Sequence, residues 1–187
     1  GIIDVAADGS ASAIASFGGD RLIVVNPVET LRVPALENHG AISVISRDSI
    51  AYGAQLINGA TMINSGTIAA QGATWAIGLA IGASFRSLNN SGTITATTEP
   101  GATGEARGVV VGTLQGNGLY TPEIVNSGVI EAATAIHVTG QRISFPPPMV
   151  NPPPPAFTVT NSNRITGAVI LIDTTDTVTN HGLIDGS

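Results

Sequence analysis

Acidic residues and histidines are the side chains of this chain that could do chemistry. Among 187 residues there are 7 Lys or Arg, 13 Asp or Glu, 3 His and no Cys. Cleavage of a polysaccharide needs carboxylates gathered on one face, as an acid/base pair or as calcium ligands. Asp173 and Asp176 lie close together in Ile-Asp-Thr-Thr-Asp-Thr, and Asp185 could approach them. We favour the interpretation that this pair belongs to a solvated turn after a buried strand.

The histidines do not predict a catalytic or metal site. His39 and His181 fill a variable slot of the motif Asn-x-Gly-x-Ile, which the chain repeats. They are five repeats apart, about 24 Å at one strand spacing per repeat, so they cannot share a metal. No nucleophile-elbow, Walker or dinucleotide-binding pattern occurs. We therefore expect no catalytic residue, no cofactor, no metal and no enzyme activity.

The repeated motif sets the elements that must position every other residue. Its copies are Asn38, Gly40, Ile42; Asn64, Gly66, Ile68; Asn90, Gly92, Ile94; Asn126, Gly128, Ile130; Asn161, Asn163, Ile165; and Asn180, Gly182, Ile184. An apolar residue stands two positions before each Asn, from Leu36 in the first copy to Val178 in the last. Alternation with period two is typical of a half-buried strand.

Two columns of the motif have structural interpretations. Asn163 replaces Gly in one copy, and Asn is the other residue that tolerates positive φ, so we predict a left-handed or otherwise sterically restricted bend there. The Asn column either caps this turn with its short amide or stacks on its equivalent in the next repeat as an amide ladder. Neither interpretation requires a ligand.

Most copies are followed by a second apolar segment, such as Ala76–Ile81 or Ala135–Val138. The spacing between motif Asn residues is 26, 26, 36, 35 and 19, which is too irregular for helical repeats. We predict an all-β fold, a single-stranded parallel β-helix (β-solenoid) of about seven coils. It forms one domain over residues 1–187 with loop insertions at 97–106 and 144–157. Residues 21–37 form a further excursion.

The ends and the charge add two expectations. Gly1-Ile-Ile-Asp4 aligns with Gly182-Leu-Ile-Asp185, so the chain starts within a motif and we expect it to be a fragment of a longer repeat protein. The net charge of −6 argues against nucleic acid as a partner and gives no reason to expect binding to an anionic membrane. No apolar run reaches the ~18 residues that span a bilayer.

The repeats resemble the passenger region of bacterial autotransporters and related secreted β-helix adhesins. In that family, Asn-Ser-Gly-x-Ile coils alternate with Ala-Ile-x-Val strands, as in Asn126–Ile130 and Ala135–Val138 here. The resemblance covers nearly the whole chain. It implies a right-handed parallel β-helix, export through the outer membrane and display on the bacterial cell surface.

Function is therefore expected in the loops and open ends. The leading hypothesis is a non-enzymatic structural or adhesive segment that binds host or neighbouring-cell surface molecules. A Pro-rich loop could present Phe145, Pro146, Pro147, Pro148, Met149 and Phe157 along a polyproline helix, or be a tolerated insertion. The alternatives are an extracellular fibre or surface-layer subunit that stacks end to end on copies of itself, and a polysaccharide-degrading β-helix enzyme.

Overall fold

The computed structural model describes residues 2–7, 11–16, 35–58, 61–83, 86–112, 122–139 and 156–186. Every regular element in these ranges is a β-strand, and every pair of strands is parallel. The predicted all-β class and parallel pairing are confirmed. This part of the chain has no helix of the length and apolarity needed to cross a membrane.

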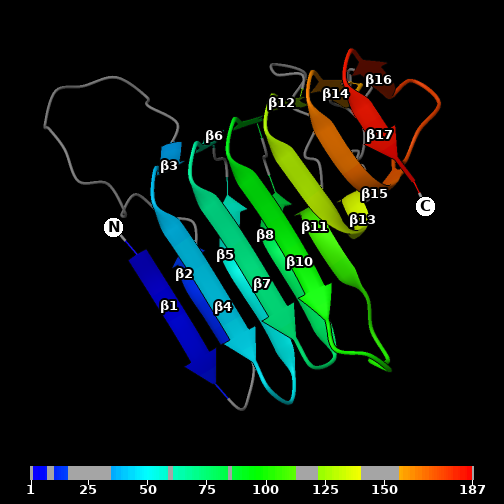
Figure 1. Ribbon diagram of the computed structural model, residues 1–187. Helices are drawn as coiled ribbons and strands as arrows, with labels where there is room; N and C mark the ends of the chain where they lie inside the picture. The colour runs from blue at the N-terminus through cyan, green and yellow to red at the C-terminus, as the bar shows by residue number, and fades with distance from the viewer. Residues whose placement is uncertain are drawn as a thin grey trace, which may run out of the picture.

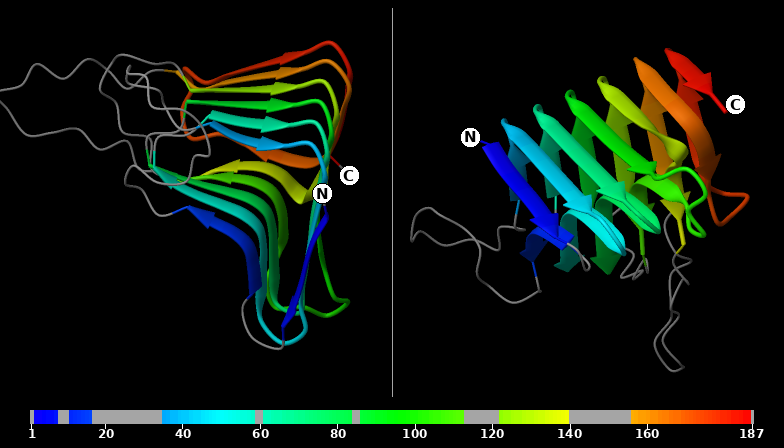
Figure 2. Two further views of the ribbon diagram at one scale, coloured as in Figure 1. Left: turned by 90° about the vertical axis from the view of Figure 1, so that its left-hand side faces the viewer. Right: turned by 60° about the horizontal axis from the view of Figure 1, so that its bottom comes forward.

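Successive repeats add strands to three stacks, called here walls one, two and three (Figures 1 and 2). Wall one holds β1 (Ile2–Ala7), β4 (Ala41–Ser46), β7 (Thr67–Gly72), β10 (Thr93–Thr98), the first parts of β13 (Val129–Val138) and β15 (Arg164–Ile170), and β17 (Leu183–Asp185). Wall two holds β2 (Ala11–Ser16), β5 (Ile50–Asn58), β8 (Trp75–Ala83), β11 (Ala106–Val111) and the last parts of β13 and β15. Wall three holds β3 (Ala35–Asn38), β6 (Thr61–Asn64), β9 (Ser87–Asn90), β12 (Glu123–Asn126), β14 (Thr158–Asn161) and β16 (Thr177–Asn180).

Walls one and two form an eleven-stranded sheet, joined because β13 pairs with both β10 and β11. Wall three is a separate six-stranded sheet. Within each wall the strand order follows the order of the repeats, so β1 and β17 lie at opposite ends of wall one (Figure 2).

The register of the strands agrees with the alignment of the motif. The motif Ile residues pair in an unbroken column from Ile3 to Ile184, and the motif Asn residues pair from Asn38 to Asn180. The apolar column from Leu36 to Val178 pairs in the same way. A slip of one residue would turn each column towards solvent, so burial of the apolar face fixes this register.

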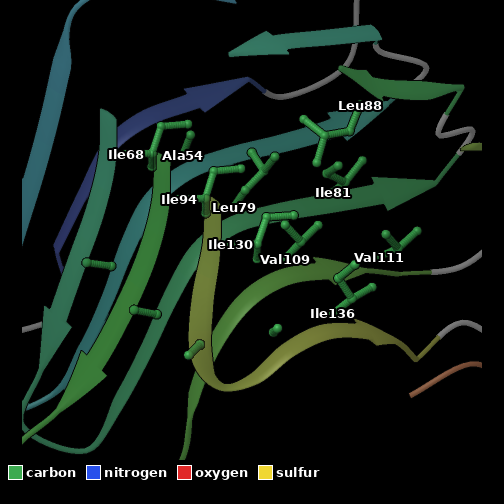
Figure 3. Packing of buried hydrophobic residues seen from close by; sticks show 14 of the residues in the cluster. Ala54, Ile68, Leu79, Ile81, Leu88, Ile94, Val109, Val111, Ile130 and Ile136 are labelled. Carbon is green, nitrogen blue, oxygen red and sulfur yellow. The ribbon is translucent and has the colours of Figure 1, made fainter. Parts of the chain in front are cut away.

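The core lies between the walls. Ile68, Ile94 and Ile130 of wall one point towards Ala54, Leu79 and Val109 of wall two (Figure 3). All six are fully buried. Each buried aliphatic side chain contributes about 1.5–3 kcal/mol relative to leaving it in water, so the apolar columns supply the main driving force for stacking.

The loop predicted at 97–106 is shorter than expected. Thr97 and Thr98 extend β10 and pair with Gln71 and Gly72, and Ala106 begins β11. Threonine suits a pleated, half-buried surface, and a neighbouring strand was available to pair with it. The connection between β10 and β11 is therefore residues 99–105.

Phe157 corrects the end of the second predicted loop, 144–157. Residues 144–155, including Phe145, Pro146, Pro147, Pro148 and Met149, lie outside the described residues. Phe157 is fully buried in the core, and its backbone N–H donates to Asp176 Oδ1 at 2.8 Å. A large apolar ring beside a strand is stabilised more by the core than by water, so Phe157 is not presented to a partner. Likewise Ala35–Asn38 form β3, so the predicted excursion at 21–37 ends before Ala35.

Candidate functional site

The motif asparagines form a ladder of side-chain amides along wall three. Each Nδ2 donates to Oδ1 of the Asn in the next repeat, at 2.7–2.8 Å in all five steps from Asn38 to Asn180. Asn64, Asn126 and Asn161 are fully buried. A buried amide is costly unless its donors and acceptor are satisfied. In the ladder, each amide receives a hydrogen bond from the preceding repeat or donates one to the next, so the buried groups are paired.

The same side chains also hold the turn of their own repeat. Asn126 Nδ2 donates to the Gly128 carbonyl at 3.1 Å and to the Arg164 carbonyl of the next repeat at 3.1 Å. At both ends of the ladder, Oδ1 of Asn38 and of Asn180 accepts the backbone N–H two residues later. Turn capping and stacking therefore occur in one side chain, and the two interpretations are not exclusive.

The glycine of the motif is not left-handed. Positive φ occurs at Gly101 and Gly167 among the described glycines, and neither belongs to the motif. A Cβ on Gly92 would instead lie 2.0 Å from the Gly66 carbonyl oxygen, and one on Gly128 would lie 2.0 Å from the Gly92 oxygen. The left-handed branch of the prediction is wrong and the sterically restricted branch is correct. The reason is close packing of one backbone on the next, which the torsion preference of Asn could not reveal.

The repeat that carries Asn163 is bonded differently from the repeats of Gly92 and Gly128. Gly92 and Gly128 each donate their N–H to the Asn carbonyl of the preceding repeat, both at 3.0 Å. Asn163 N–H donates to Asn161 Oδ1 at 3.4 Å, and its own amide reaches the Ser127 carbonyl at 3.2 Å. A side-chain hydrogen bond to the preceding repeat thus accompanies the altered backbone contact.

A second small-residue column escaped the sequence reasoning. Gly53, Gly78 and Gly108 stack on wall two, followed by Ala135. A Cβ on Gly78 would lie 2.7 Å from both the Gly108 oxygen and Ile94 Cγ2. The signal was present as Ala-x-Gly followed by an apolar residue in three successive repeats. These glycines leave room for the Ile column of wall one.

The acidic residues in the column that follows the motif Ile do not lie next to one another. Positions after the motif Ile pair in the column Asp4, Ser43, Ala69, Thr95, Glu131, Thr166 and Asp185, as the alignment predicted, so Thr166 separates Glu131 from Asp185.

Asp173 and Asp176 order the turn between β15 and β16. Asp176 Oδ2 accepts the N–H groups of Ile172 and Asp173 at 3.2 and 3.0 Å, and Asp173 Oδ1 accepts that of Thr175 at 3.1 Å. Carboxylates used in this way cap backbone donors. This geometry agrees with the solvated-turn interpretation.

Among the described residues, a cluster of polar and aromatic side chains lies on wall two. The Arg107 guanidinium lies 4.7 Å from the centre of the Trp75 ring, and its Nε is 3.3 Å from Glu105 Oε2. Thr134 Oγ1 donates to Glu105 Oε1. These residues come from β8, β11, β13 and the 99–105 connection, so only the folded register brings them together. Arg107 contacts Trp75 of the preceding repeat and Glu105 accepts from Thr134 of the following repeat, so the cluster links three successive repeats.

His137 belongs to the same region and has an altered acidity. Burial, then the positive charge of Arg107, lower the pKa of His137, and Glu105 opposes them. Its Nδ1 is buried without a hydrogen-bond partner. His39 and His181 are exposed, and His39 contacts Ser65 Oγ at 2.6 Å and Glu37 Oε2 at 3.2 Å. In the described part of the chain, no three His, Asp or Glu side chains lie close enough together to hold a metal ion.

Comparison with known proteins identifies no relative. No family model matches the sequence, and no curated protein or solved structure matches it significantly.

Proposed function

We propose that the chain is a right-handed β-solenoid of about seven coils that acts as a rigid, non-enzymatic scaffold of an exported bacterial surface protein. In this proposal it presents connecting segments to molecules on host or neighbouring cells. The observation that carries the proposal is the position of the long connections. Those between Ser16 and Ala35, Gly112 and Pro122, and Thr139 and Ala156 all join wall two to wall three.

The other two corners are more constrained. Wall three passes to wall one through the two residues that follow the motif Asn, and the amide ladder fixes that turn in every repeat. Wall one passes to wall two through seven residues at most (99–105), and in β13 the strand continues around the corner without a break. The connections between wall two and wall three are therefore the ones that vary most in length, and loops of this kind tolerate insertions without disturbing the strands they join.

Sequence content supports display at this edge. Residues 146–155 contain seven prolines, a composition that favours extended chain and suits recognition by a partner. The resemblance to autotransporter passengers supports the surface location. Asp173 and Asp176 cap backbone donors, which favours a scaffold over a hydrolytic site.

The proposal can be tested by deleting the Pro-rich connection, with the short connection between β5 and β6 as the template for what remains. Four residues join Leu56 of β5 to Thr61 of β6. Removing 141–155 leaves Thr139, Gly140, Ala156 and Phe157, also four residues, between the equivalent strands. We expect this variant to keep its far-ultraviolet circular dichroism and thermal midpoint, because no described strand is shortened.

Fluorescent beads coated with the chain or with the deletion variant would be applied to cultured epithelial cells. We expect the deletion to reduce bead adhesion at least tenfold. A matched control removes residues 100–103 at the other corner and should leave adhesion unchanged. Equal adhesion of all three proteins, or none with the intact chain, would contradict display by this segment. Release of reducing ends from polygalacturonate by the intact chain would favour the enzymatic alternative.

A further inference from the structure

We propose that Ser65 is a reactive hydroxyl that accepts an acyl group from an activated carboxylic ester, with His39 as the general base and Glu37 as the residue that positions the base. This reaction goes beyond the display of connecting segments and does not depend on what those segments bind. His39 and Ser65 lie in the turns of two successive repeats between wall three and wall one, and Glu37 lies in β3.

The imidazole of His39 joins a hydroxyl to a carboxylate. Its Nδ1 lies 2.6 Å from Ser65 Oγ, and its Nε2 lies 3.2 Å from Glu37 Oε2. An ionised carboxylate only accepts hydrogen bonds, so the ring proton of the neutral imidazole lies on Nε2. Nδ1 is then an acceptor, and the Ser65 hydroxyl donates to it. A hydroxyl within reach of a base that a third group orients is the arrangement that activates a nucleophile.

Serines in the same slot of other repeats lack the base. Ser91 and Ser127 each follow a repeat with serine in the slot, where Ser65 follows a repeat with His39. Ser65 Oγ and Ser91 Oγ contact the Asn carbonyl of the preceding repeat at 3.4 and 3.5 Å, so their backbone surroundings match. The chain therefore contains its own reference serines.

His181 provides a reference for a histidine without the carboxylate. It fills the same slot as His39, but Thr179 stands two residues before it, where His39 has Glu37. Its backbone pairs with the repeat of Ser162, so it neighbours that serine. Any difference in reactivity between Ser65 and Ser162 then measures what orientation of the ring adds.

The slot is exposed in each copy of the motif, as the structure shows for His39, Ser65, Ser91, Ser127, Ser162 and His181. Ser91 and Ser127 belong to internal repeats, so this exposure is a property of the turn and not of the first repeat. A small ester can therefore reach Ser65 Oγ from solvent.

The reaction that this arrangement supports is acyl transfer. Ser65 Oγ forms a bond to the carbonyl carbon of the ester, and its proton passes to His39 Nδ1. The bond from that carbon to the leaving oxygen then breaks, and the proton passes from Nδ1 to the leaving alcohol. The negative charge of Glu37 disfavours phosphoryl donors, which are themselves anionic.

The acyl group should remain on Ser65. Hydrolysis of an acyl-serine is fast where backbone N–H groups stabilise the oxyanion of the tetrahedral intermediate. The N–H groups of Ser65 and Gly66 both donate to the Asn38 carbonyl, at 2.8 and 3.1 Å. Since these donors are engaged, the site reacts once per chain, which agrees with a scaffold that does not turn over a substrate.

The test treats the intact chain with p-nitrophenyl acetate and follows the acetylation of each serine by peptide mass mapping. We expect Ser65 to be acetylated at least about tenfold faster than Ser91 and Ser162, since a general base contributes about 10²–10⁴-fold. All three serines belong to one folded chain, so the ratio of their rates does not depend on overall stability.

Variants separate the base from the residue that positions it. His39→Ser introduces the residue that four other copies carry in this slot, and should lower the Ser65 rate to that of Ser91. Glu37→Gln keeps the imidazole and should lower the rate by at least about threefold. Glu123→Gln is the matched control, because Glu123 is also exposed on wall three, and it should leave the rate unchanged. Circular dichroism checks that each variant is folded.

Equal acetylation of Ser65 and Ser91 overturns the proposal, as does a Ser65 rate that His39→Ser leaves unchanged. Release of p-nitrophenolate with no acetyl group retained on Ser65 also overturns it. Equal rates in Glu37→Gln and Glu123→Gln would remove Glu37 from the proposal.

Discussion

Replacement of one buried ladder residue tests whether the amides hold the stack together. Asn126 is fully buried, and its side chain makes four polar contacts with one accepted hydrogen and two donated ones. It accepts from Asn90 at 2.7 Å, and donates to Asn161 Oδ1 at 2.8 Å and to the Gly128 and Arg164 carbonyls at 3.1 Å each. Asn126→Ala removes all four.

The expected cost follows from those contacts. A hydrogen bond contributes about 0.5–1.5 kcal/mol net, so the three hydrogens involved give an upper range of about 1.5–4.5 kcal/mol. Several partners keep another bond: Asn90 Nδ2 still reaches the Gly92 carbonyl at 3.3 Å, and Asn161 Oδ1 still accepts the Asn163 N–H at 3.4 Å. We therefore expect Asn126→Ala to lower the free energy of unfolding by about 3 kcal/mol.

Asn180→Ala is the matched control, since Asn180 is exposed at the end of the ladder and accepts one bond from a neighbouring repeat. Its cost should be about 1 kcal/mol or less. Urea unfolding followed by circular dichroism measures both differences from the shift in midpoint and the slope. Equal costs for the buried and the exposed asparagine would refute the reasoning.

Three further variants test other features of the stack. Gly92→Ala should lower the free energy of unfolding by more than about 3 kcal/mol, because its Cβ would lie 2.0 Å from the Gly66 oxygen. Gly101 has open space around it and a φ of 84°, so Gly101→Ala should lower that free energy by about 1–2 kcal/mol. Thermal or urea unfolding measures both, and similar losses would show that the backbone torsion, and not the close contact, selects glycine. Phe157→Ala should lower the free energy of unfolding by about 3–5 kcal/mol in the same assay. An unchanged midpoint would show that Phe157 belongs to the loop and not to the core. Because burial and Arg107 lower the pKa of His137, the unfolded chain binds its proton first, and stability should fall as pH drops below about 6.5. His137→Gln should make the urea midpoint less dependent on pH below about 6.5. An unchanged slope in this variant would show that His137 is not the group responsible.

Local pattern was sufficient to predict the strand columns. The motif Ile column, from Ile3 to Ile184, and the Asn column pair as the alignment required. Period-two alternation dictates which face is buried, and identical spacing from Asn to Ile in each copy dictates the register. Both properties are short-range, so a single sequence contains them.

The role of the motif glycine was only half predictable. The sequence showed that Gly66, Gly92 and Gly128 stand in a restricted position, which Asn163 can also occupy. Whether the restriction is a torsion or a contact depends on how near the next backbone comes, and that distance exists only between repeats. The cluster of Trp75, Glu105, Arg107 and Thr134 was missed for a similar reason, since its members meet only across adjacent strands of wall two and the connection at 99–105.

By itself, the sequence determined that this chain is all-β, which residues stack in columns, and where its composition departs from the repeat. The tertiary structure decided that Phe157 belongs to the core, that carboxylates at 173 and 176 close a turn, and that the longest connections join strands of wall two to strands of wall three. The physical reason is the range of the interactions involved. Alternation and spacing act between neighbours in the chain, while close backbone contact, burial and edge position arise only when one repeat lies against the next.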